Sequence, residues 1–131
     1  MKKDIEIPVI EDVYVAAVRE KHEEYQTLDW NAYLINDRAE AIEGVLIVTK
    51  GYDGKRETST MRHSISKLPP QSFAKVEFLQ DDVLQLNNEF SVSFFAESKM
   101  FHKKFVFKKN SINEKALQEI PVMQKKGVLL K

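Results

Sequence analysis

Apolar residues recur at every second position through most of this chain, in short runs separated by turn residues. The segment 30–36, WNAYLIN, places Trp30, Ala32 and Leu34 on one face of an extended backbone. Successive side chains of a β-strand point to opposite faces, whereas a helix needs apolar residues at about every third or fourth position. The same alternation fills the segments 57–65, 73–78, 90–97 and 100–108. The pattern therefore predicts strands along most of the chain.

Two further runs are apolar without strict alternation. The segment 13–18, VYVAAV, is apolar on both faces, which is typical of a central strand that is buried on both sides. The segment 42–49 contains VLIV and leads into Asp53-Gly54, a turn signal because glycine tolerates a positive φ. Pro69 and Pro70 must interrupt any ladder, since proline donates no backbone hydrogen bond. A further turn is expected at Asn87-Asn88.

The chain holds about seven or eight such short strands with turns between them, which predicts a mostly β, antiparallel fold. We expect an immunoglobulin-like β-sandwich, with a small oligonucleotide-binding (OB)-like β-barrel as the alternative. A short C-terminal helix is expected after Asn110, because Ser111 and Glu114 form a capping box and Pro121 ends the segment. No boundary or repeat divides residues 1–131, so a single domain is expected.

Composition limits the function classes. Lys+Arg and Asp+Glu both number 20, so the chain has no overall positive field to attract nucleic acid. The absence of cysteine excludes disulfides, thiolate catalysis and Cys-ligated metals. The N-terminal segment lacks the apolar stretch of a signal peptide, and no window approaches the about 18 apolar residues of a membrane span. We therefore expect a cytoplasmic protein without membrane contact.

Catalytic and cofactor motifs find no support in the residues. His22, His63 and His102 are far apart in the chain, and no metal-binding spacing joins them. Ser91 and Ser93 occupy the polar face of a predicted strand, and the glycines form no phosphate-binding motif. We expect no enzyme activity and no cofactor. A hydrolase would need a deep pocket that joins carboxylates or histidines from different strands.

The segment 100–109, MFHKKFVFKK, interleaves aromatic residues with lysines. It has two interpretations. A stacking platform for nucleic acid would use its four lysines with the phenylalanines between them. A core strand would instead bury the phenylalanines, while a lysine in the same register protects a sheet edge from pairing. The lysines are Lys103, Lys104, Lys108 and Lys109.

The C-terminal residues Val128, Leu129 and Leu130 form a short apolar run. They are expected to add an edge strand, to cover the core, or to contact a partner if they are exposed.

The segments WNAYLIND, GYDG and KLPPQSFAKVEF together resemble a family of small uncharacterised bacterial all-β proteins over nearly the full length of the chain. Some members are labelled as an alpha subunit of phenylalanyl-tRNA synthetase, but the four arginines of this chain stand in no synthetase motif. The resemblance implies a compact β fold and no activity. A tryptophan strand, a Leu-Pro loop and late aromatic strands also resemble immunoglobulin-like sandwiches, without their two cysteines.

The function that these observations favour is a non-enzymatic protein-interaction module, which docks a protein partner or a second copy through a sheet edge or loops. Nucleic-acid binding through the segment 100–109 is the first alternative, and a hydrolase with a spatially assembled site is the second.

Overall fold

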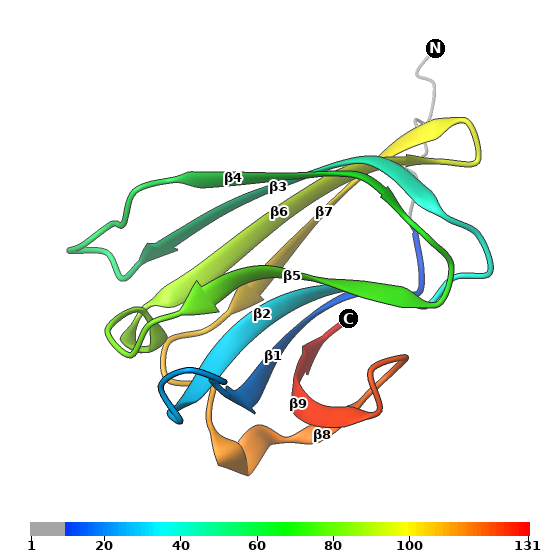
Figure 1. The fold of residues 1–131 in the computed structure, drawn as a ribbon. Helices are drawn as coiled ribbons and strands as arrows, with labels where there is room; N and C mark the ends of the chain where they lie inside the picture. Colours follow the sequence, from blue (N-terminus) through cyan, green and yellow to red (C-terminus); the bar gives the residue numbers. More distant parts are fainter. Residues whose placement is uncertain (1–9) are drawn as a thin grey trace.

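Two antiparallel β-sheets lie face to face in the computed structural model, which describes residues 10–131 (Figure 1). The five-stranded sheet has the order β5 (Ser72–Leu79), β2 (Leu28–Asn36), β1 (Val13–Lys21), β9 (Lys125–Leu130) and β8 (Gln118–Ile120). The four-stranded sheet has the order β4 (Met61–Leu68), β3 (Ile42–Tyr52), β6 (Asn87–Ala96) and β7 (Lys99–Phe107). Within the described residues neither sheet closes into a barrel, so the OB-like alternative is wrong.

The main core fills the space between the sheets. Trp30, Ala32 and Leu34 face it from β2, as the alternation predicts, and Val13 and Val15 face it from β1. The other sheet contributes aromatic and branched side chains from β3, β6 and β7. They include Ile47, Phe90, Val92, Phe94, Phe101, Phe105 and Phe107. Removing this apolar surface from water is the main stabilising term of the fold.

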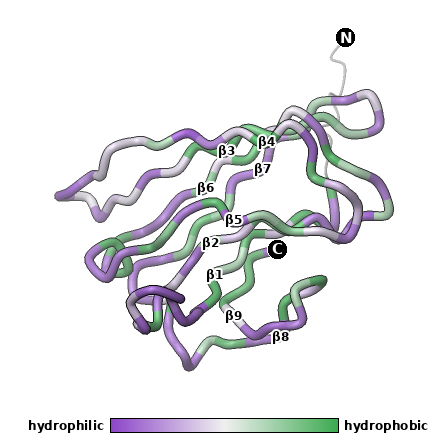
Figure 2. The backbone as a smooth tube through the Cα atoms, in the orientation of Figure 1, coloured by the Kyte–Doolittle hydropathy of each residue, from purple (hydrophilic) through white to green (hydrophobic). Residues whose placement is uncertain are grey.

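A second, smaller core lies on the outer face of the five-stranded sheet. Ala16 and Val18 of β1 are buried there, so the prediction that segment 13–18 is buried on both sides is confirmed. The covering residues come from the C-terminal segment, which pairs with β1 through β9 and folds over the sheet (Figure 1). Figure 2 shows the hydrophobic character of β1 and β9 beside the hydrophilic hairpin that joins β1 to β2. The buried members are Ala16, Val18, Tyr33, Ile35, Ile120, Met123 and Leu129.

The predicted C-terminal helix is wrong. Only a single 3₁₀ turn, Glu114–Ala116, forms there, and the backbone then enters β8. The side chain of Asn113, not that of Ser111, caps the turn by accepting from the backbone N–H of Lys115 at 2.8 Å. Two helical turns are unstable alone, whereas pairing with β9 supplies backbone hydrogen bonds to the same residues.

Two turn predictions have different outcomes. The Asp53-Gly54 turn is confirmed, with Gly54 at φ 89° and the Asp53 carboxylate accepting from the backbone of Lys55 and Arg56. These hydrogen bonds lower the pKa of Asp53 to about 2. The predicted turn at Asn87-Asn88 is wrong, because both residues belong to β6. In the described residues no helix is long and apolar enough to span a membrane.

Candidate protein-docking surface

Three large apolar side chains are exposed together on the outer face of the four-stranded sheet. Phe95 of β6 and Met100 of β7 are direct cross-strand partners and are 48% and 58% exposed. Leu46 of β3 is 39% exposed and lies diagonally from Phe95 in the β3–β6 ladder. We call Leu46, Phe95 and Met100 the outer patch.

The β6–β7 hairpin forces these residues outward. Phe94 and Phe95 are consecutive in a strand, so only one can face the core. Phe94 does so, fully buried, and its ring stacks on Phe101 at 5.8 Å between centroids. Their neighbours Phe95 and Met100 are therefore paired on the outside. The two consecutive phenylalanines are a signal for this surface in the sequence, because strict alternation in segment 90–97 can bury only one of them.

The backbone beneath the outer patch fits the exposed ring closely. Gly44 adopts φ +54°, and a Cβ atom there would lie 3.2 Å from the ring of Phe95. The β3–β6 register shifts at this point, between Glu43 and Leu46. Gly44 therefore provides both the positive φ and the space that let the Phe95 ring lie over β3.

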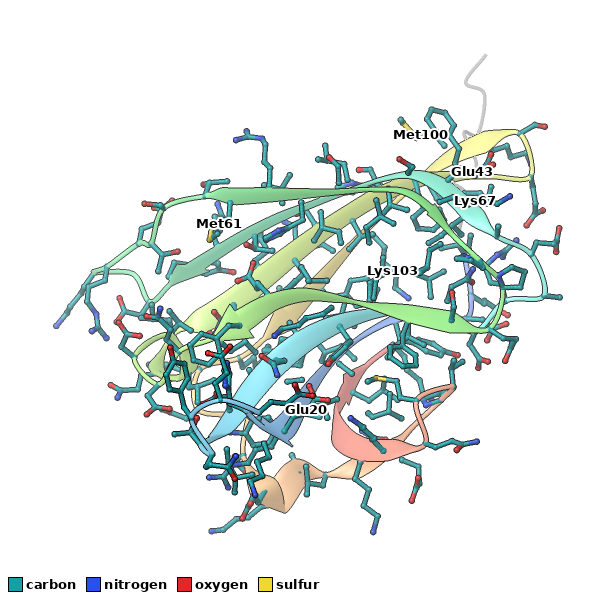
Figure 3. All side chains as sticks on the ribbon, in the orientation of Figure 1. Glu20, Glu43, Met61, Lys67, Met100 and Lys103 are labelled. Carbon is teal, nitrogen blue, oxygen red and sulfur yellow. The ribbon has the colours of Figure 1, made fainter. Side chains whose placement is uncertain are left out.

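Polar groups surround the outer patch. Glu43 and Lys67 are cross-strand partners beside it, and Figure 3 shows both at the same end of the sheet as Met100. On the next row of the sheet, Ser93 Oγ lies 2.8 Å from His102 Nδ1. An apolar centre with a polar rim is the usual anatomy of a protein–protein interface.

The Ser93–His102 pair lacks the other parts of a hydrolase. No carboxylate among the described residues contacts His102 to orient it, and the pair lies on an open sheet face. The backbone N–H groups around Ser93 belong to a β-ladder, so they cannot form an oxyanion hole. The contact is a cross-strand hydrogen bond without the geometry for acyl transfer.

A second polar cluster joins the two sheets at one edge. Glu77 of β5 accepts from the Thr49 hydroxyl at 2.7 Å, and its Oε1 lies 2.8 Å from His63 Nε2 of β4. The cavity beside Glu77 measures about 200 Å³, less than the usual size of a ligand site. The three side chains therefore connect β3, β4 and β5 across the open side of the sandwich. The described residues hold no group of three metal-ligating side chains that includes a histidine.

The phenylalanines of β7 are core residues. Phe101, Phe105 and Phe107 are 6%, 3% and 1% exposed, so no base could stack on them. Lys103 shares their register and is half-buried, with its ammonium 5.0 Å from the centroid of the Phe105 ring. Figure 3 shows it between the two sheets. Since β7 is an edge strand, Lys103 has the position that the edge-protection interpretation predicts.

The remaining lysines of this segment do not join Lys103. Lys104 points to the outer face, where its ammonium lies 3.9 Å from a carboxylate oxygen of Glu89. Lys108 and Lys109 are exposed and follow the end of β7. Of the four predicted nucleic-acid contacts, Lys103 and Lys104 thus lie on opposite faces of β7, and Lys108 and Lys109 lie beyond its end.

The C-terminal run is not exposed to a partner. Val128 and Leu129 are 7% and 8% exposed, and Leu130 is half-buried. These residues pair with Ala17, Ala16 and Val15 of β1. The run covers the core and adds a strand, but β9 lies between β1 and β8 and is not the edge strand that was expected. The exposure on which the expected partner contact depends is absent from Val128 and Leu129.

Known proteins provide no precedent for this surface. No family model, no curated protein and no solved structure matches the chain. The resemblance to small bacterial all-β proteins therefore stays a prediction. Function has to follow from the exposed side chains themselves.

Proposed function

We propose that this chain is a non-enzymatic protein-interaction module that docks a partner on the outer patch. The observation that carries this proposal is the exposure of Phe95 and Met100 as a cross-strand pair. Large apolar side chains exposed together on a sheet mark contact sites more often than isolated ones do. Aromatic residues and methionine are also enriched at interfaces, and both are present here.

The strand pairing supports an immunoglobulin-like scaffold. The order β1-β2-β5 corresponds to strands A, B and E of that fold, and β4-β3-β6-β7 corresponds to C′, C, F and G. The chain changes sheet between β2 and β3, between β4 and β5, and between β5 and β6, as this assignment requires. Strands β9 and β8 then extend the sheet beyond strand A. The outer patch lies on the face formed by C, F and G.

The expected occupant is a separate protein that binds reversibly. Three apolar side chains form a small contact centre, whereas permanent dimers bury large and more hydrophobic surfaces. The flanking Glu43 and Lys67 supply both signs of charge at the rim, which favours a partner with complementary charges.

Met100 and Met61 provide a matched test. Both are exposed methionines on edge strands of the same sheet, at 58% and 51%, and Figure 3 shows them at opposite ends. Tagged wild-type protein, Met100→Lys and Met61→Lys are used to capture partners from lysate of the source cells, after nuclease treatment. We expect Met100→Lys to lose the proteins that wild type retains, and Met61→Lys to keep them.

Three outcomes would contradict the proposal. Equal capture by both variants would remove the outer patch as the contact site. Capture that disappears with nuclease would indicate nucleic acid. A concentration-dependent dimer of wild type in light scattering, abolished only by Met100→Lys, would show that the occupant is a second copy.

A further inference from the structure

A groove lies on the opposite sheet, between the β1–β2 hairpin and β5. Its volume is about 450 Å³, within the range of small-molecule sites. An adjoining depression of about 300 Å³ shares four of its lining residues. The groove is lined by His22, Tyr25, Thr27, Asp29, Asn31, Lys75 and Phe78. We call this the hairpin groove.

Two aromatic rings supply its apolar surface. Tyr25, in the hairpin, is 71% exposed, and Phe78 of β5 is 47% exposed. Phe78 is the cross-strand partner of Asn31, so its ring adjoins a polar group of the groove. Such exposure leaves the rim open, and the groove therefore suits a ligand that extends beyond its ends.

His22 presents a hydrogen-bond donor to the groove. Its Nδ1 accepts from the backbone N–H groups of Glu24 and Tyr25, at 3.2 and 3.3 Å. In the neutral ring the proton must therefore be on Nε2. The ring also packs against that of Tyr25, with 4.8 Å between centroids, which fixes its orientation.

Acceptors and a cation complete the polar lining. Asn31 donates its amide to Glu20 at 3.0 Å, so its carbonyl oxygen is left to accept. One carboxylate oxygen of Asp29 accepts from Thr27 at 3.2 Å, and the other has no partner within residues 10–131. The Lys75 ammonium has no ion-pair partner in the same part of the chain.

The Asn31 side chain is held in place by Glu20 of the neighbouring strand, which lines the adjoining depression. Glu20, which fixes Asn31, also accepts from the Tyr33 hydroxyl and from Lys125, both at 2.6 Å. Figure 3 shows Glu20 on the five-stranded sheet near β9. Asn31 is only 8% exposed, so its carbonyl is oriented before any ligand arrives.

The chemistry of the lining selects a ligand class. Asp29 and Lys75 present opposite charges at one site, so a simple anion or cation would meet repulsion from one of them. Hydroxyl groups both donate and accept, so neighbouring hydroxyls of one ligand can donate to the carboxylate and the amide oxygen and accept from the imidazole and the ammonium. A sugar ring adds an apolar C–H face that packs on an aromatic ring. We infer that the hairpin groove binds a neutral oligosaccharide, at a site separate from the outer patch.

Titration monitored by amide NMR tests this inference. The probes are neutral hexasaccharides of glucose, mannose, xylose and N-acetylglucosamine. We expect at least one probe to shift the amides of segments 20–31 and 75–78. Tyr25→Ala and Phe78→Ala should each weaken its affinity by about tenfold, as expected for the loss of one stacking contact. Phe73→Ala is the matched control, since Phe73 is 44% exposed on the same strand and outside the groove.

Several results would overturn the inference. They are the absence of shifts with every probe, shifts confined to the outer patch, and equal loss of affinity in Phe73→Ala and Phe78→Ala. Free phenylalanine tests the competing ligand class, amino acids, whose ammonium and carboxylate groups could pair with Asp29 and Lys75. Binding of phenylalanine alone would assign the groove to amino acids. Each variant's amide spectrum reports whether it is folded. A groove that binds no sugar would leave the proposed docking of a protein on the outer patch unaffected.

Discussion

Gly127 is the residue whose replacement tests the packing of the C-terminal segment most directly. A Cβ atom at Gly127 would lie 2.5 Å from the carbonyl oxygen of Ala17 and 3.1 Å from a methyl carbon of Val18. The φ of Gly127 is outside the left-handed region, so glycine is needed here for space and not for conformation. Gly127→Ala must therefore push β9 away from β1.

The expected cost is about 2 kcal/mol. Overpacking in a closed site costs roughly 1–3 kcal/mol, and here the obstructing atom belongs to the backbone and cannot rotate away. For a domain of this size, that loss corresponds to a melting temperature lower by about 6–10 °C. Gly54→Ala is the comparison, because Gly54 has φ +89° and nothing within 4 Å of the added atom. Its cost is conformational only, about 1 kcal/mol.

Urea unfolding measures both variants. Trp30 is the only tryptophan and is 7% exposed in the main core, so its fluorescence reports global unfolding. Amide hydrogen exchange of β9 reports local detachment, which would leave the tryptophan transition in place. The close approach to Ala17 is refuted if Gly127→Ala changes the unfolding free energy by less than about 0.5 kcal/mol and leaves the hydrogen exchange of β9 unchanged.

Two further predictions concern the same region. Met123→Ala should lower the unfolding free energy by about 2–4 kcal/mol, because Met123 is 6% exposed in the second core. Leu117 is exposed, so Leu117→Ala should change the unfolding free energy by less than about 0.5 kcal/mol. Equal effects of the two substitutions in urea unfolding would contradict the burial of Met123. Burial acts to raise the pKa of Glu20, but hydrogen bonds from Lys125, Tyr33 and Asn31 together lower it below the usual 4.5. The ionised Glu20 side chain therefore stabilises the fold above pH 4.5, and this stabilisation is lost as the pH falls through the lowered pKa. The stability difference between wild type and Glu20→Gln should be largest near neutral pH and shrink as the pH falls below 4.5 through the lowered pKa. A difference that does not depend on pH would refute the role of the charge.

The predictable part of the fold is the part with a strong local pattern. Alternation in the segment WNAYLIN correctly assigned Trp30 and Leu34 to the inner face of β2, because one buried face imposes a period of two on the sequence. The C-terminal helix failed for the opposite reason. Its capping signal at Ser111 and Glu114 was local, and the pairing of β8 with β9 was stronger.

The docking surface was less predictable than the core. In the sequence, Phe95 follows a buried phenylalanine and Met100 precedes one, which indicates only that each could face outward. Their pairing depends on the register of β6 and β7, and the approach of Gly44 depends on a bulge in β3. The hairpin groove is still less visible, since Tyr25 and Phe78 are far apart in the chain and meet only through the pairing of β2 with β5.

The sequence by itself determined that this protein is a β protein, which strand faces are buried, and where the Asp53-Gly54 turn lies, because each depends on residues close together in the chain. The tertiary structure decided which strands are neighbours and what covers the outside of the sheets. The C-terminal run shows the difference. Its apolar residues predicted either burial or contact with a partner. The structure assigns the run to the core, because β9 pairs with β1 and the carbonyl of Ala17 leaves room only for glycine at position 127. Contacts between residues that are distant in the chain leave no periodic pattern in the sequence, and those contacts form both candidate binding surfaces.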